Sequence, residues 1–192
     1  KTIQNHYQEK KLNKRKKIFI FFTLSMNLQE ALKTRRSVRN YSNEVPSQEL
    51  IEKVIEMACY APSAHNQQAW TFFLITKAED RNFLGELMEF GKMIPQAPWT
   101  VLATYDTSLL RSPEFIQQDM GAAMQNLLLA SHAEGLGAVW VGLYPHEAEM
   151  QAIHQHFQLP ESIVPFALVA IGKPAGELRE KRLKTEGKIQ IL

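Results

Sequence analysis

The chain has 192 residues, of which 45% are hydrophobic, and it contains one cysteine. This length and composition suit one compact domain with a sizeable core, and a single cysteine excludes an internal disulfide and a cysteine-rich metal site. Residues 1–25 hold seven Lys/Arg and one Glu, whereas the rest of the chain holds 15 basic and 19 acidic residues, so the main body lacks the basic surface of a nucleic-acid-binding domain.

The first 25 residues differ in character from the rest of the chain. A basic stretch at residues 10–17 precedes an apolar run at residues 18–24, as in a secretory leader. The run is far shorter than the ~20 residues that a membrane-spanning helix needs, and no A-x-A-type cleavage site follows it. We expect residues 1–25 to be an extension upstream of a start at Met26, and residues 26–192 to be the folded domain of a cytoplasmic protein. A secretory signal is the alternative.

From Met26 onward, helical and strand patterns alternate. Ser47 is a good N-cap for the second helix, which Pro62 ends. The longest helical pattern, residues 115–134, is apolar almost all round, which predicts a helix buried in the domain or at a subunit interface. Further helices are expected at residues 28–34, 80–90 and 147–157, and strands at residues 70–76, 99–105, 138–144, 166–171 and 188–192. The alternation predicts a three-layer α+β domain.

Two segments carry the chemistry. The first, residues 35–39, places three guanidiniums and a hydroxyl within five residues at the end of the first expected helix. Arginine suits bidentate contact with phosphate, although a basic pentapeptide alone is typical of a solvated surface. The second, residues 61–70, is a polar turn directly before a buried strand, and taken alone it is equally an ordinary helix-ending turn.

In this order and spacing, the two segments resemble the FMN-dependent nitroreductase family, whose members carry R-R-S-x-R near the start and A-P-S-x-x-N-x-Q-P-W further on. The resemblance continues at residues 119–130, 135–142 and 169–174, with Ala69 in place of the usual Pro. It implies a nitroreductase-like α/β/α sandwich, a mixed central sheet flanked by helices, and a homodimer with FMN at the subunit interface.

The resemblance also assigns the cofactor contacts. One wall touches the phosphate, the ribityl chain and the N1/O2 edge of the ring, where a fixed cation favours the anionic reduced ring. This wall consists of Arg35, Arg36, Ser37 and Arg39. A second wall, from the neighbouring subunit, consists of Pro62, Ser63, Ala64 and Asn66. A backbone N–H for N5 comes from Val141, Gly142 and Leu143, and a last pair, Lys181 and Arg182, binds phosphate. No side chain is expected to act as acid or base, because the cofactor performs the chemistry.

The function implied by the resemblance is an oxidoreductase with a ping-pong mechanism. NADH or NADPH gives hydride to flavin N5, and a nitroaromatic, quinone or related acceptor then receives two electrons. Alternatives are a specialised relative, such as a dehalogenase or an ene-reductase, and a non-catalytic protein that binds or stores flavin. We expect no nucleic-acid or membrane partner.

Metal binding is not expected. His154 and His156, two positions apart on one helix, do not share a face, and neither cysteine nor well-spaced carboxylates complete a ligand set with His146.

Overall fold

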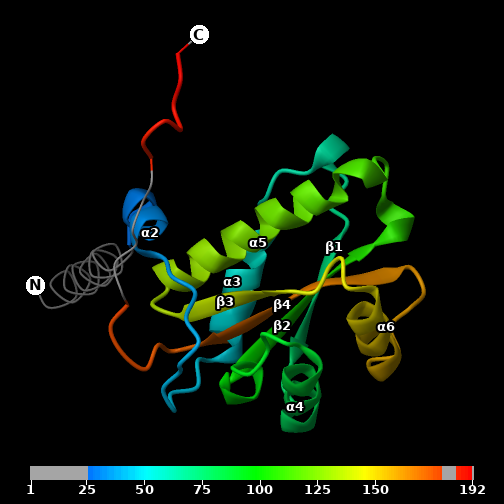
Figure 1. Cartoon of the computed structure of the whole chain (residues 1–192), viewed down its shortest axis with the longest axis horizontal. Helices are drawn as coiled ribbons and strands as arrows, with labels where there is room; N and C mark the ends of the chain where they lie inside the picture. The colour runs from blue at the N-terminus through cyan, green and yellow to red at the C-terminus, as the bar shows by residue number, and fades with distance from the viewer. Residues whose placement is uncertain (1–25, 179–184, 192) are drawn as a thin grey trace, which may run out of the picture.

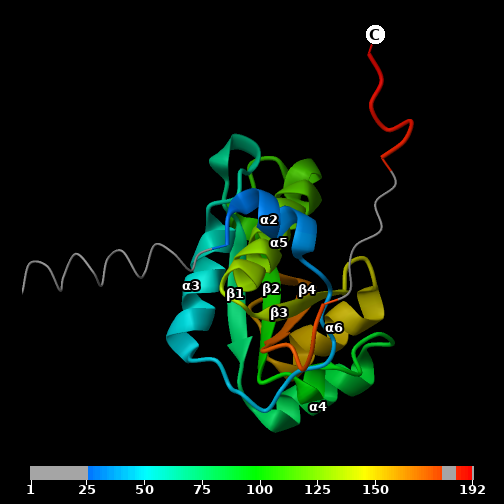
Figure 2. The same ribbon diagram turned by 90° about the vertical axis from the view of Figure 1, so that its left-hand side faces the viewer.

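The computed structural model describes residues 26–178 and 185–191. The helices and strands, all within residues 26–178, form three layers (Figures 1 and 2). A four-stranded sheet with the order β1-β2-β4-β3 lies in the middle, and it consists of β1 (Trp70–Ile75), β2 (Trp99–Asp106), β3 (Gly137–Gly142) and β4 (Ile163–Gly172). Helices α3 (Gln48–Cys59) and α5 (Ile116–Ala133) cover one face, and α4 (Ala78–Leu87) and α6 (Glu147–His156) cover the other. The three-layer α+β architecture is therefore confirmed.

All three strand pairings are antiparallel. The one parallel pairing among the described residues is an isolated bridge between Ser37 and Ala138. The expected mixed sheet is thus antiparallel in its named strands, a property that apolar runs do not reveal because strands of either direction can be buried on both faces.

Strand alternation divides the core in two. On β2, Val101 and Ala103 face α3 and α5, whereas Leu102 faces α4 and α6, as the two-residue period of a strand requires. The expected buried helix is α5, in which Met124 and Leu127 are fully buried. None of the described helices is both long and apolar enough to cross a membrane.

Most element ends follow local signals in the sequence. The Ser47 side chain accepts a hydrogen bond from Leu50 N at 3.3 Å, which confirms it as the N-cap of α3. Helix α4 begins two residues and ends three residues earlier than expected, and it ends there because Met88 has an extended backbone.

The expected terminal strand is wrong for its described residues. Residues 188–191 are not in a strand, and Ile189 and Ile191 are 85% and 97% exposed. A strand needs hydrogen bonds from a neighbouring strand, and none lies beside these residues in the described part of the chain.

Candidate functional site

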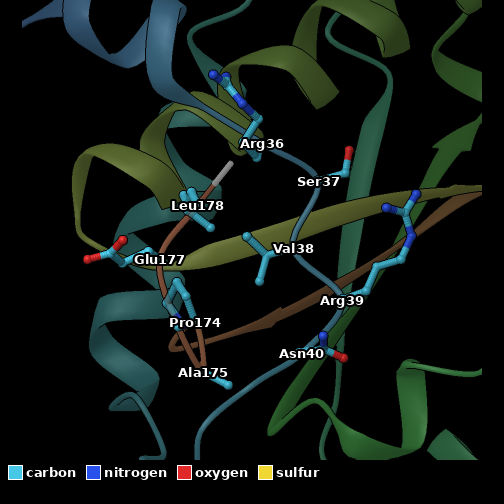
Figure 3. Close-up of a pocket in the computed structure, with 10 residues that line it drawn as sticks. Arg36, Ser37, Val38, Arg39, Asn40, Pro174, Ala175, Glu177 and Leu178 are labelled. Atoms are coloured by element: carbon cyan, nitrogen blue, oxygen red, sulfur yellow. The ribbon is translucent and has the colours of Figure 1, made fainter. Parts of the chain in front are cut away.

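A cavity of about 440 Å³ lies between the basic segment, residues 35–39, and the chain that follows β4 (Figure 3). Residues 36–40 line one side and residues 174–178 line the other. Arg36, Ser37 and Arg39 are therefore brought together at one cavity, as expected. Arg35, the C-cap of helix α2 (Leu28–Thr34), is half-buried and does not line it.

The basic segment is held against the start of β3. Val38 N donates to Ala138 O at 3.1 Å, and the Val38 side chain is buried. A Cβ on Gly137 would come within 2.6–2.9 Å of the Val38 side chain. Only glycine at position 137 therefore lets the segment lie this close to the sheet.

Tyr41 anchors the other end of the segment. Its hydroxyl lies 2.8 Å from Val38 O and 3.0 Å from Ala170 O, to both of which it can donate. Burial raises the pKa of Tyr41 well above its ordinary value, so the phenol stays a donor. Ala175 N also donates to Asn40 O at 3.0 Å. The segment is thus fixed between β3 and the chain that follows β4.

Within the segment, the side chains divide into two groups. Arg36 turns back over the end of α2, where its Nη1 donates to Lys33 O at 3.0 Å and to Arg35 O at 2.6 Å. Ser37 and Arg39 are exposed, and Figure 3 shows both directed to the same side of the segment, as alternate residues of an extended chain are. Ser37 and Arg39 therefore offer a hydroxyl and a guanidinium to a bound anion.

The polar turn at residues 62–66 is built on the start of α5. Asp119 is only 6% exposed, and its carboxylate accepts from Ala64 N at 2.9 Å and from Gln67 Nε2 at 2.6 Å. His65 and Asn66 both have positive φ, 49° and 51°, a strained conformation that these bonds help to hold. Sequence reasoning gave Asp119 no role, although a carboxylate on an almost wholly apolar helix was a signal that could have found it.

The basic segment and the polar turn lie at opposite ends of α5. The turn is tied to Asp119 near the helix start, whereas Thr34, just before the segment, bonds His132 near the helix end at 2.7 Å. Thirteen residues at a rise of 1.5 Å separate the two anchors by roughly 20 Å. A single chain therefore does not bring the two expected walls together.

The third expected segment lies at the far end of β3. Val141 and Leu143 are buried in the core beneath α4 and α6, so their side chains do not reach a ligand. Gly142 is exposed, and a Cβ built on it meets nothing within 4 Å. It lies four residues along the strand from Ala138, or about 13 Å.

The remaining expectations concern phosphate and metal. Lys181 and Arg182 lie outside the described residues. In the described part of the chain, no group of three or more His, Cys, Asp or Glu side chains is placed to hold a metal ion.

Comparison with known proteins gives consistent matches over this region. The model of the Nitroreductase family matches residues 32–97 and 90–173. A protein of Methanothermobacter thermautotrophicus provisionally named NADH dehydrogenase/NAD(P)H nitroreductase is 39% identical over 150 residues, which are 78% of each chain. An iodotyrosine deiodinase of Haliscomenobacter hydrossis is 28% identical over 190 residues, which cover 82% of this chain and 84% of the deiodinase. A Desulfovibrio desulfuricans nitroreductase, solved in complex with FMN, has a TM-score of 0.77 and 28% identity and covers 88% of this chain and 98% of its own.

Proposed function

The chain belongs to the nitroreductase family, and we propose that it uses FMN to pass electrons from NAD(P)H to a nitroaromatic, quinone or related acceptor. The observation that carries the proposal is the pairing of Ser37 and Arg39, exposed on one side of a segment that is fixed at both ends. The membership of the family supports the assignment of this segment to the flavin wall. The class of the enzyme, an NAD(P)H-dependent flavin oxidoreductase, follows from the family and from relatives named as NAD(P)H nitroreductase and FMN reductase.

The residues present fit FMN. Ser37 and Arg39 on the cavity wall, with Arg35 two residues before Ser37, supply the hydroxyl donor and the cations that a phosphate and a reduced ring edge need. Gly142 leaves open space and an accessible backbone at the end of β3, where a flat ring can approach closely. When bound, FMN supplies hydride acceptance at N5 and two-electron transfer to the acceptor. The protein's own task is to bind and orient the cofactor and to place fixed charge beside it.

The electrostatic role falls to Arg39. A guanidinium stays protonated at every working pH, and its fixed charge lies where negative charge gathers on the reduced ring. Such preorganised charge stabilises the reduced form most, because it needs no rearrangement during the reaction. Two half-reactions at one open face, with the nicotinamide leaving before the acceptor binds, make the mechanism ping-pong.

A homodimer with two interfacial sites is part of the proposal. It is supported by the roughly 20 Å along α5 between the anchors of the basic segment and of the polar turn. Residues 62–66 of one subunit complete the site begun by Arg35 to Arg39 of the other. We place this dimer in the cytoplasm.

A second candidate reaction rests on the deiodinase relative. Reductive dehalogenation would use the same cofactor site and a halogenated aromatic acceptor, so it differs only in the second half-reaction. A flavin-storage protein, in contrast, would bind FMN without turnover.

The experiment that tests the proposal is the visible spectrum of the purified protein, recorded without air before and after NADH or NADPH. We expect a flavin spectrum that bleaches with the nicotinamide and recovers with a nitroaromatic or a quinone. Recovery only with a halogenated aromatic would favour the dehalogenase. Bound flavin that neither nicotinamide reduces would indicate storage, and no flavin after reconstitution with FMN would overturn the cofactor assignment.

A further inference from the structure

Thr34 and His132 form a contact that the proposed function leaves unexplained. Thr34 Oγ1 lies 2.6 Å from Glu30 O and 2.7 Å from His132 Nε2. A carbonyl can only accept, so the single hydroxyl proton of Thr34 goes to Glu30 O, and His132 Nε2 must then donate to Thr34 Oγ1. The geometry therefore places a proton on Nε2, in the neutral and in the charged ring alike.

The contact lies directly before the basic segment. Thr34 is the last residue of α2, and His132 lies in the last turn of α5. The connection from α5 to β3 then supplies Gly137 and Ala138, which hold Val38. One continuous stretch of chain thus fixes the basic segment at two points, through Thr34 and through Val38.

The charges around His132 come from several elements. The guanidiniums of Arg35 and Arg36 repel a proton on the ring, and the Glu30 carboxylate on α2 attracts one. Burial is the largest cause that lowers the pKa of His132 below its ordinary value, and the two guanidiniums lower it further. Among the other charges near this end of α5, Lys53 of α3 and Glu134 form an ion pair at 2.7 Å. Lys173 after β4, whose Nζ lies 3.9 Å from a Cβ built on Gly135, is paired with Glu44 at 3.8 Å.

We propose that His132 is a positioning residue for the cofactor phosphate: its ring fixes the start of the basic segment through Thr34, and a phosphate bound at the basic segment draws a proton onto that ring. The inference rests on the proposed function, because it takes FMN as the source of the phosphate. It assigns His132 no contact with the flavin, since it acts through Thr34 and through its charge.

The sign of the coupling follows from the charges. In the free protein, the guanidiniums disfavour the imidazolium. A bound phosphate offsets them, so binding raises the affinity of the ring for a proton, and protonation raises the affinity of the protein for FMN. The imidazolium still donates from Nε2, so the bond to Thr34 survives. An opposite charge nearby raises the pKa of an imidazole, and one pKa unit corresponds to at most about a tenfold change in affinity.

The test compares the pH dependence of FMN binding in the wild type and in His132→Gln, measured on the full-length protein by quenching of flavin fluorescence. Glutamine can donate to Thr34 Oγ1 but does not titrate. We expect the two proteins to agree within about threefold at pH 8, and the wild type to bind roughly three- to eightfold more tightly at pH 5.5, since the full tenfold of one pKa unit is reached only well below both pKa values of the ring. The phosphate of FMN also titrates in this range, but its effect is common to both proteins and cancels in the ratio.

Two controls sharpen the comparison. His154→Gln changes a histidine on α6 that bonds only the carbonyl of Pro160, at 3.1 Å, and its profile should follow the wild type. NMR titration of the His132 ring in the wild type, with and without FMN, avoids any effect of the substitution on folding, and its pKa should rise by about one unit with FMN.

An affinity ratio that stays constant with pH, or an unchanged ring pKa in the presence of FMN, would overturn the coupling while leaving FMN binding in place. Failure of the wild type to bind FMN at any pH would instead remove the proposed function, and this inference with it.

Discussion

Arg39 of the basic segment and Asp119 of α5 show how differently one chain uses charge. Arg39 is exposed and lines the cavity, whereas Asp119 is buried under two hydrogen bonds from the polar turn. The first could be predicted, because a cluster of arginines is visible in the sequence and matches a family motif. For the second, a carboxylate on an almost wholly apolar helix marks the position, but its role depends on Ala64 and Gln67, which only the fold brings to it.

Arg39→Ala should weaken FMN binding and lower the reduction potential of the bound flavin. The substitution removes a fixed cation from the proposed ring edge and disturbs no packing, since the side chain is exposed. Loss of a charge-assisted contact corresponds to about 1.5–3 kcal/mol, or roughly ten- to a hundredfold in affinity. Fluorescence titration and an anaerobic redox titration measure the two effects. If both values match the wild type, Arg39 does not lie at the ring.

Asp119→Ala should destabilise the protein by about 2–4 kcal/mol, because it leaves Ala64 N and the buried Gln67 amide without their acceptor. Urea unfolding measures the change. Asp119→Asn keeps one acceptor oxygen and should lose less, and Glu114→Ala, at an exposed position nearby, should change the stability by no more than about 0.5 kcal/mol. Equal stability of all three variants would mean that Asp119 does not support the turn.

At the scale of elements, helical and strand periodicity predicted where most of them lie, because each buries an apolar face that repeats locally. Periodicity contains no information on strand direction, and the sheet proved antiparallel. The expected strand at the C-terminus failed for its described residues, since an apolar pattern alone supplies no hydrogen-bonding neighbour. The bridge from Ser37 to Ala138, which places the basic segment on β3, is likewise a long-range pairing.

The two glycines of β3 should respond differently to alanine. In Gly137→Ala, the new Cβ would meet Val38 at 2.6–2.9 Å, so the basic segment must move away from the sheet. We expect a loss of about 1–3 kcal/mol in stability from the overpacking, together with weaker FMN binding. Urea unfolding of the cofactor-free protein and FMN titration measure both.

Gly142→Ala is the matched substitution, because its Cβ would meet nothing within 4 Å. The stability of the cofactor-free protein should stay within about 0.5 kcal/mol of the wild type. FMN affinity should nevertheless fall, because the methyl group occupies the space proposed for the ring. An FMN affinity equal to that of the wild type in this variant would show that the ring does not bind at the end of β3.

At the scale of the whole molecule, the separation of the two walls is the central observation. They occur 26 positions apart in the sequence, between Ser37 and Ser63, and nothing in that spacing reveals that α5 keeps their anchors roughly 20 Å apart. The dimer was expected from a family resemblance alone, and the separation of the two walls in one chain supports the proposal. In the proposed dimer, each subunit would offer half of two different sites.

Complementation between two defective subunits tests this arrangement. Arg39→Ala damages the first wall and Asn66→Ala the second, so each homodimer should bind FMN poorly. In a mixed two-fold dimer, one site combines the intact Arg39 of one subunit with the intact Asn66 of the other, and the second site carries both substitutions. Mixed dimers isolated with two affinity tags should therefore bind one FMN per dimer with wild-type affinity, as measured by titration. If both walls of a site came from one chain, every site in the mixed dimer would carry a substitution, and no tight binding would return.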